Sequence, residues 1–80
     1  MIDSETKEKV VVRTEGGAGA YIMVPLDQIA EIEGILRDNR VSFWVDSDAI
    51  SLDGKPAISV INLGRGADVA RVQRLLDAAN

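Results

Sequence analysis

Two segments carry apolar residues at the spacing of an amphipathic helix. In residues 26–39 the stripe consists of Leu26, Ile29, Ile32 and Leu36, and in residues 67–79 it consists of Val69, Val72, Leu75, Leu76 and Ala79. Pro25 suits the first turn of one helix, and Asp68 favours the positive end of the dipole of the other. The pattern predicts a helix in each segment.

Short runs rich in β-branched residues predict the strands. The runs are Val10–Thr14, Ala20–Val24, Val41–Asp46, Ala49–Leu52 and Ala57–Asn62. The third and fourth runs form one long strand, 41–52, if the chain bends or bulges at residues 46–48. Glycines at 16, 17 and 19 suit a hairpin connection, and Asp53-Gly54 is the strongest hairpin signal in the chain.

The element order is therefore β-β-α-β-β-α, which indicates the α+β class. The simplest packing is a two-layer sandwich, with a largely antiparallel four-stranded sheet and both helices on one face. If residues 20–24 stay unpaired, the remaining β-α-β-β-α order resembles a ferredoxin-like fold without its last strand. This resemblance concerns the fold alone and implies no function.

The chain has 80 residues, which is the size of one small domain. Residues 1–7 show no apolar period and are expected to form a flexible tail, so the domain spans 8–80. Shifting the chain by 40 residues aligns Ile29–Leu36 with Val69–Leu76, with matching apolar positions. Either the domain consists of two degenerate 40-residue units, or two similar helices share this spacing by chance.

Composition excludes several kinds of chemistry. The chain has no cysteine and no histidine, which rules out disulfides, thiolate nucleophiles, histidine-based dyads and triads, and Cys or His metal ligands. Its formal charge of −4 argues against nucleic acid as a partner. Ala18–Leu26 is the longest apolar stretch and is too short to cross a membrane. We expect a cytoplasmic protein that is not an enzyme, with no catalytic residues, metal or cofactor.

The strands carry more apolar residues than one covered sheet face needs. A second apolar face is expected to include Val11, Tyr21, Ile22, Trp44 and Ile61. An exposed patch of several hundred Å² is more than most monomers leave uncovered. It predicts a homodimer or a complex with another protein, most simply a two-fold dimer. The alternatives are short, strongly twisted strands, or an N-terminal tail that folds over the face.

Two loops raise the question of ligands. Gly64, Arg65 and Gly66 follow a strand and precede a helix, where backbone N–H groups and Arg65 can hold an anionic small ligand. The dinucleotide fingerprint is incomplete, because Val69 stands where its third glycine belongs. Asp46, Asp48 and Asp53 lack the spacing of a calcium loop and fit a solvated strand edge better.

Together these features predict a small acidic interaction or regulatory module that self-associates through its open sheet face. The alternative is a small-ligand sensing domain that binds an anionic metabolite near Gly64–Gly66 or at a dimer seam.

Overall fold

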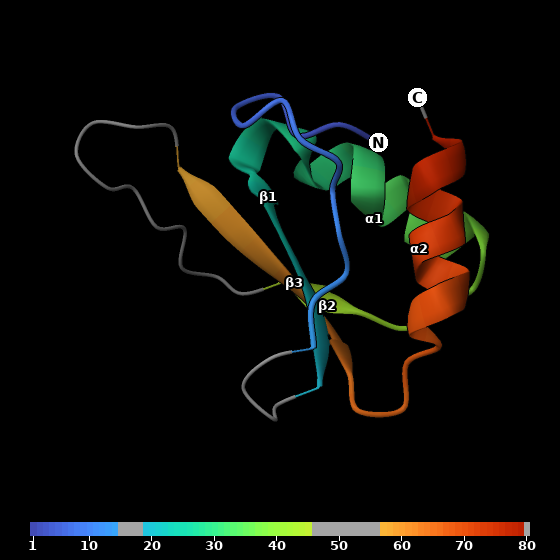
Figure 1. Cartoon of the computed structure of the whole chain (residues 1–80). Coiled ribbons are helices and arrows are strands. Elements are labelled where there is room, and N and C mark those ends of the chain that lie inside the picture. The colour runs from blue at the N-terminus through green and yellow to red at the C-terminus, as the bar shows by residue number, and fades with distance from the viewer. Residues whose placement is uncertain (15–18, 46–56, 80) are drawn as a thin grey trace.

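The computed structural model describes residues 1–14, 19–45 and 57–79 (Figure 1). The elements are β1 (Ala20–Pro25), the 3-10 turn η1 (Leu26–Gln28), α1 (Ile29–Asp38), β2 (Trp44–Val45), β3 (Ile58–Gly64) and α2 (Val69–Ala78). They form an α+β domain, with a three-stranded antiparallel sheet within the described residues and two helices on one side of it.

The strand β3 is the centre of the sheet, whose order is β1-β3-β2. Both neighbours run antiparallel to β3, with Ile22 opposite Ile61 and Trp44 opposite Asn62. Consequently β1 and β2 run parallel to each other, with β3 between them and α1 as their connection. The predicted four-stranded, ferredoxin-like layout is not confirmed, because only three strands form in the described part of the chain.

The core lies between the helices and one face of the sheet. Its fully buried side chains come from both layers: Ile22, Val24, Ile61, Ile32, Leu36, Val72 and Leu76. Each helix contributes two buried residues spaced four apart, because this spacing places side chains on one helix face. The predicted helices are thus confirmed, and their bounds differ by 40 residues at both ends. A duplication of the whole unit stays a prediction.

Capping hydrogen bonds fix where the helices begin and end. Asp68 stands at the N-cap of α2, where its Oδ1 accepts from the N–H of Arg71 at 3.0 Å. At the end of α1, the Asn39 side chain donates to the carbonyl oxygen of Ile35 at 2.8 Å. Both caps satisfy backbone groups that a helix end leaves unpaired.

Residues 1–14, which we call the N-terminal arm, pack against the domain (Figure 1). Met1 is only 5% exposed and belongs to the core. A turn at Asp3 then reverses the chain, so that Ile2 bridges Lys9. The structure thus places residues 1–7 in contact with the domain, whereas the sequence predicted a tail; the flexibility of this segment stays a prediction.

Two glutamine side chains fasten the arm. The Gln28 side chain accepts from the N–H of Ser4 and donates to the carbonyl of Ile2, each at 2.9 Å. Gln73 on α2 makes the same pair of bonds to the N–H of Val12, at 2.8 Å, and the carbonyl of Val10, at 3.1 Å. In each case one amide binds the backbone on both sides of a single residue, as a neighbouring strand does.

This arrangement explains why the predicted strand Val10–Thr14 does not form. Its backbone meets β1 at one bridge, between Arg13 and Tyr21, and is then held by Gln73 rather than by the sheet. Within the described residues, the predicted strand 41–46 is present as Trp44–Val45, and residues 41–43 are not part of it. The predicted strand 57–62 is confirmed as β3 with slightly shifted ends. The predicted strand 49–52, its alternative 41–52 and the Asp53-Gly54 hairpin extend outside the described residues.

Candidate functional site

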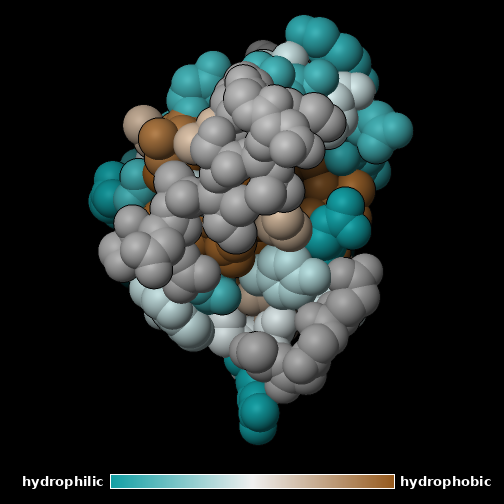
Figure 2. All heavy atoms as spheres, turned by 90° about the vertical axis from the view of Figure 1, so that its left-hand side faces the viewer, coloured by the Kyte–Doolittle hydropathy of each residue, from teal (hydrophilic) through white to brown (hydrophobic). Residues whose placement is uncertain are grey.

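One face of the sheet is turned away from both helices. Side chains alternate along each strand, so the residues between the core positions project to this side. We call these residues the open face; they are Tyr21, Met23, Trp44, Ile58, Val60 and Asn62. None of them is charged, although 28% of the chain is charged. Figure 2 views this side and shows apolar atoms, in brown, reaching the surface among hydrophilic residues.

Trp44 is the most prominent residue of the open face. It is 56% exposed, although large aromatic side chains are usually covered. Its ring lies over Gly64 on β3, because a Cβ built on that glycine would stand 3.6 Å from Cζ3 of the indole. Gly64 has a φ of +82°, a conformation that other residues rarely adopt. One side of the indole ring thus packs against Gly64, while much of the Trp44 side chain stays in water.

The structure separates the five predicted interface residues into two groups. Tyr21 and Trp44 lie on the open face, and Val11 is exposed on the N-terminal arm. Ile22 and Ile61 are fully buried opposite each other in the core, so their expected place on the second face is wrong.

Sequence reasoning also missed part of the open face. Met23, which is 41% exposed, and Val60 are cross-strand partners there. The sequence does contain a signal for this face, because in the run Ala20–Val24, Tyr21 and Met23 alternate with the apolar residues at 20, 22 and 24. Choosing the correct set required the register with β3, which the run itself does not contain.

The predicted ligand loop lies at the turn from β3 to α2. Gly64 ends the strand, and Arg65 and Gly66 are exposed in the turn. A shallow hollow of about 180 Å³ touches Gly64 and Arg65. The carboxylate of Asp68 already occupies the N-terminus of α2, where an anionic ligand would otherwise bind. The geometry therefore adds no support for an anion at this loop.

An ion pair links the N-terminal arm to α2. Asp77 lies 3.2 Å from the ammonium of Lys9. The hydrogen bond from Gln73, assisted by Lys9, lowers the pKa of Asp77 below its ordinary value of 3.8. Across residues 1–14, 19–45 and 57–79, no three acidic side chains come close enough together to hold a metal ion. The candidates Asp46, Asp48 and Asp53, and glycines 16 and 17, lie outside the described residues.

Comparisons with known proteins give no relative from which a function could be transferred. The chain matches no family model, and no curated protein or solved structure is significantly similar to it. In the part of the chain that the structure describes, no helix has the length and apolar character needed to cross a membrane. A functional proposal must therefore rest on the surfaces of this domain.

Proposed function

We propose that this domain is a non-enzymatic interaction module that self-associates through its open face, as a two-fold homodimer. The observation that carries the proposal is the absence of charge among the six open-face residues, combined with the exposure of Trp44. A sheet face that meets water normally carries polar side chains. Four of the six open-face residues are instead apolar, namely Met23, Trp44, Ile58 and Val60.

A second copy of the chain suits this face better than a charged partner does. The protein carries a formal charge of −4, so two copies repel each other at long range. The open face brings no like charges of its own into contact, and a two-fold axis pairs it with an identical neutral surface. Charged partners would have to bury their own charges against apolar side chains, which is costly.

The free energy that burial of the open face can contribute to dimer formation is modest. A tryptophan buries roughly 150–250 Å², so the 56% exposure of Trp44 leaves on the order of 100 Å² to cover. At about 25 cal/mol per Å², this ring contributes about 2–3 kcal/mol per protomer before association costs. Since the open face spans three short strands, we expect a small interface and a dimer that dissociates on dilution.

Sedimentation equilibrium over a range of concentrations tests the proposal. We expect a dimer that becomes a monomer on dilution, and a monomer throughout for Trp44→Glu. Trp44→Arg should have the same effect, because the cause is lost apolar contact and not added negative charge. Leu26→Glu is the matched control, since Leu26 is 53% exposed but lies in the turn after β1, outside the sheet. A monomeric wild type, or a dimeric Trp44→Glu, would contradict the proposal.

A further inference from the structure

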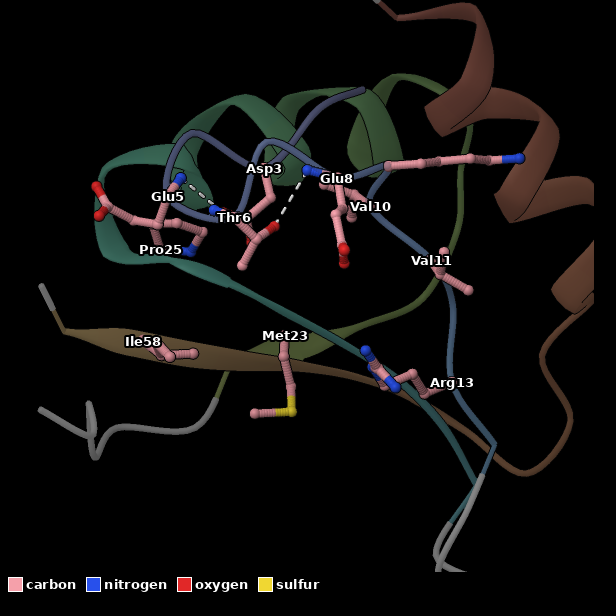
Figure 3. A pocket seen from close by; sticks show the side chains of 11 residues that line it. Asp3, Glu5, Thr6, Glu8, Val10, Val11, Arg13, Met23, Pro25 and Ile58 are labelled. Carbon is pink, nitrogen blue, oxygen red and sulfur yellow. Dashed lines mark hydrogen bonds between the residues drawn. The ribbon is translucent and has the colours of Figure 1, made fainter. Parts of the chain in front are cut away.

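A cleft of about 490 Å³ lies between the N-terminal arm and the outer edge of β1 (Figure 3). The arm forms one wall, and β1 and β3 contribute Met23, Pro25 and Ile58 to the other. This is the position that a fourth strand next to β1 would occupy. The outer edge of β1 therefore has space beside it for another strand. Such a strand could bind only if backbone N–H and C=O groups of β1 face the cleft.

Hydrogen bonds at Tyr21 establish which backbone groups face the cleft. The N–H of Tyr21 donates to the carbonyl of Arg13 at 2.9 Å, and the N–H of Arg13 donates to the carbonyl of Tyr21 at 2.8 Å. Both backbone groups of Tyr21 thus point away from β3. The backbone groups of successive residues in a strand point to opposite edges, so those of Met23, two residues after Tyr21, also point away from β3. Pro25, two residues on, fits this direction because it has no N–H to donate.

The arm does not use the Met23 groups. At Val10 and Val12 its backbone is bonded to Gln73 on α2, so on the N-terminal side of Arg13 the arm lies away from the edge of the sheet. Within the described residues, the outward N–H and C=O of Met23 have no hydrogen-bond partner. An extended peptide could complete both bonds, as in other cases of strand addition to a sheet edge.

The charge of the cleft indicates the kind of peptide. Its arm wall carries the carboxylates of Asp3, Glu5 and Glu8, and Figure 3 shows the Glu8 side chain extending towards the strands. Lys9 also lines the cleft, but its ammonium is directed to Asp77 on α2. Arg13 stands at the end where the arm meets β1. The cleft therefore presents more negative than positive charge, beside the apolar side chains of Met23 and Ile58.

We propose that the cleft binds an extended segment of another protein, in which apolar residues alternate with lysine or arginine. The segment adds to β1 as a strand and bonds to the backbone of Met23, while its basic residues face the carboxylates of the arm. A second copy of this acidic chain is a poorer occupant, because its net charge of −4 opposes entry beside three carboxylates.

The probe is a short capped peptide of alternating lysine and valine, titrated into the labelled protein and followed by NMR. We expect saturable binding below about 1 mM, with the largest shift at the amide proton of Met23. Glu8→Lys should weaken binding about tenfold or more, and Glu31→Lys on the exposed surface of α1 should not. Peptides of alternating glutamate and valine should not bind.

Two further measurements separate strand addition from charge attraction. N-methylation of the valine amides should abolish binding, because it removes the donors of the added strand. Met23→Pro should do the same by removing the N–H on the protein side, with Met23→Ala as the control for the lost side chain. Equal binding of the N-methylated peptide, an unmoved Met23 amide proton, or no binding at about 1 mM would overturn the proposal. Repeating the titration with Trp44→Glu makes the result independent of dimer formation.

Discussion

Removal of the Gln73 side chain should loosen the arm and destabilise the whole domain. The Gln73 amide bonds to the N–H of Val12 at 2.8 Å and to the carbonyl of Val10 at 3.1 Å, and both valines are buried. Gln73→Ala leaves both backbone groups without this partner. Each such bond contributes about 0.5–1.5 kcal/mol, so the expected loss is about 1–3 kcal/mol. A domain of 80 residues has a total stability of only about 4–12 kcal/mol.

Thermal unfolding followed by circular dichroism measures this loss. A change of this size lowers the melting temperature of so small a domain by roughly 5–20 °C. Hydrogen exchange at the N–H of Val12 should also accelerate, because the amide loses its acceptor. Arg74→Ala, an exposed neighbour on α2, is the control and should change stability by no more than about 0.5 kcal/mol.

Gln73→Glu refines the test, because it keeps the shape and one acceptor but replaces the donor. A second carboxylate would then face both the carbonyl of Val10 and Asp77, whose Oδ1 accepts from Gln73 at 3.0 Å. We expect destabilisation at neutral pH, because these neighbours raise the pKa of the new carboxyl group in the folded state above its ordinary value of about 4.3. The destabilisation should fade as the pH falls towards about 4.3 and be absent below it. A Gln73→Ala protein that melts like the wild type, with Val12 still protected, would refute the proposed fastening of the arm.

Substitutions at four other positions test local features of the fold. Gly19→Ala should lower the free energy of unfolding by more than about 1 kcal/mol in chemical denaturation, since φ is +98° and the new Cβ would stand 2.6 Å from the carbonyl carbon of Gly64. Gly34→Ala is the opposite case: it has open space around it in α1 and should raise the free energy of unfolding by about 0.5–1 kcal/mol. Asp68→Ala should cost about 1 kcal/mol of unfolding free energy through the lost cap of α2, and Asp68→Asn should retain most of it. Asp77→Asn should lower the melting temperature near neutral pH. Because the pKa of Asp77 is lowered in the folded state, this difference should be complete above pH 3.8 and fade as the pH falls further. A difference in melting temperature that does not change with pH would contradict the role assigned to the Asp77 carboxylate.

The helices could be predicted from the sequence because their signals are local. The buried positions of α2, Val72 and Leu76, repeat at helical spacing, and Asp68 marks its start within the same segment. Strands β1 and β3 were found for the same reason, since their runs are rich in apolar residues and end near Pro25 or Gly64. These elements depend on residues that are neighbours in the sequence.

The N-terminal arm could not be predicted, because its partners are distant in the sequence. Val10–Thr14 has the composition of a strand, but the amide that binds its backbone belongs to Gln73, more than 60 residues away. Burial of Met1 likewise depends on contact with a core that residues 1–7 do not form by themselves.

Assignment of residues to the two sheet faces failed for a related reason. A shift of one residue exchanges the two faces of a strand, and only pairing with β3 fixes the choice. Ile22 and Tyr21 were therefore equally good candidates in the sequence, and the structure buries Ile22 opposite Ile61 and turns Tyr21 to the open face. Trp44 was placed correctly, because a tryptophan in an alternating run with Phe43 and Val45 had to lie on the opposite side from them.

Trp44 itself provides the most direct test of self-association through the open face. It is the single tryptophan of the chain and is 56% exposed in the protomer, so its fluorescence reports on this surface alone. Serial dilution should shift its emission to longer wavelength as water reaches the ring, with the same midpoint as the change in mass measured by sedimentation. An emission spectrum that stays constant while a dimer dissociates would place the dimer contact elsewhere, and a mass that is monomeric at every concentration would contradict self-association altogether.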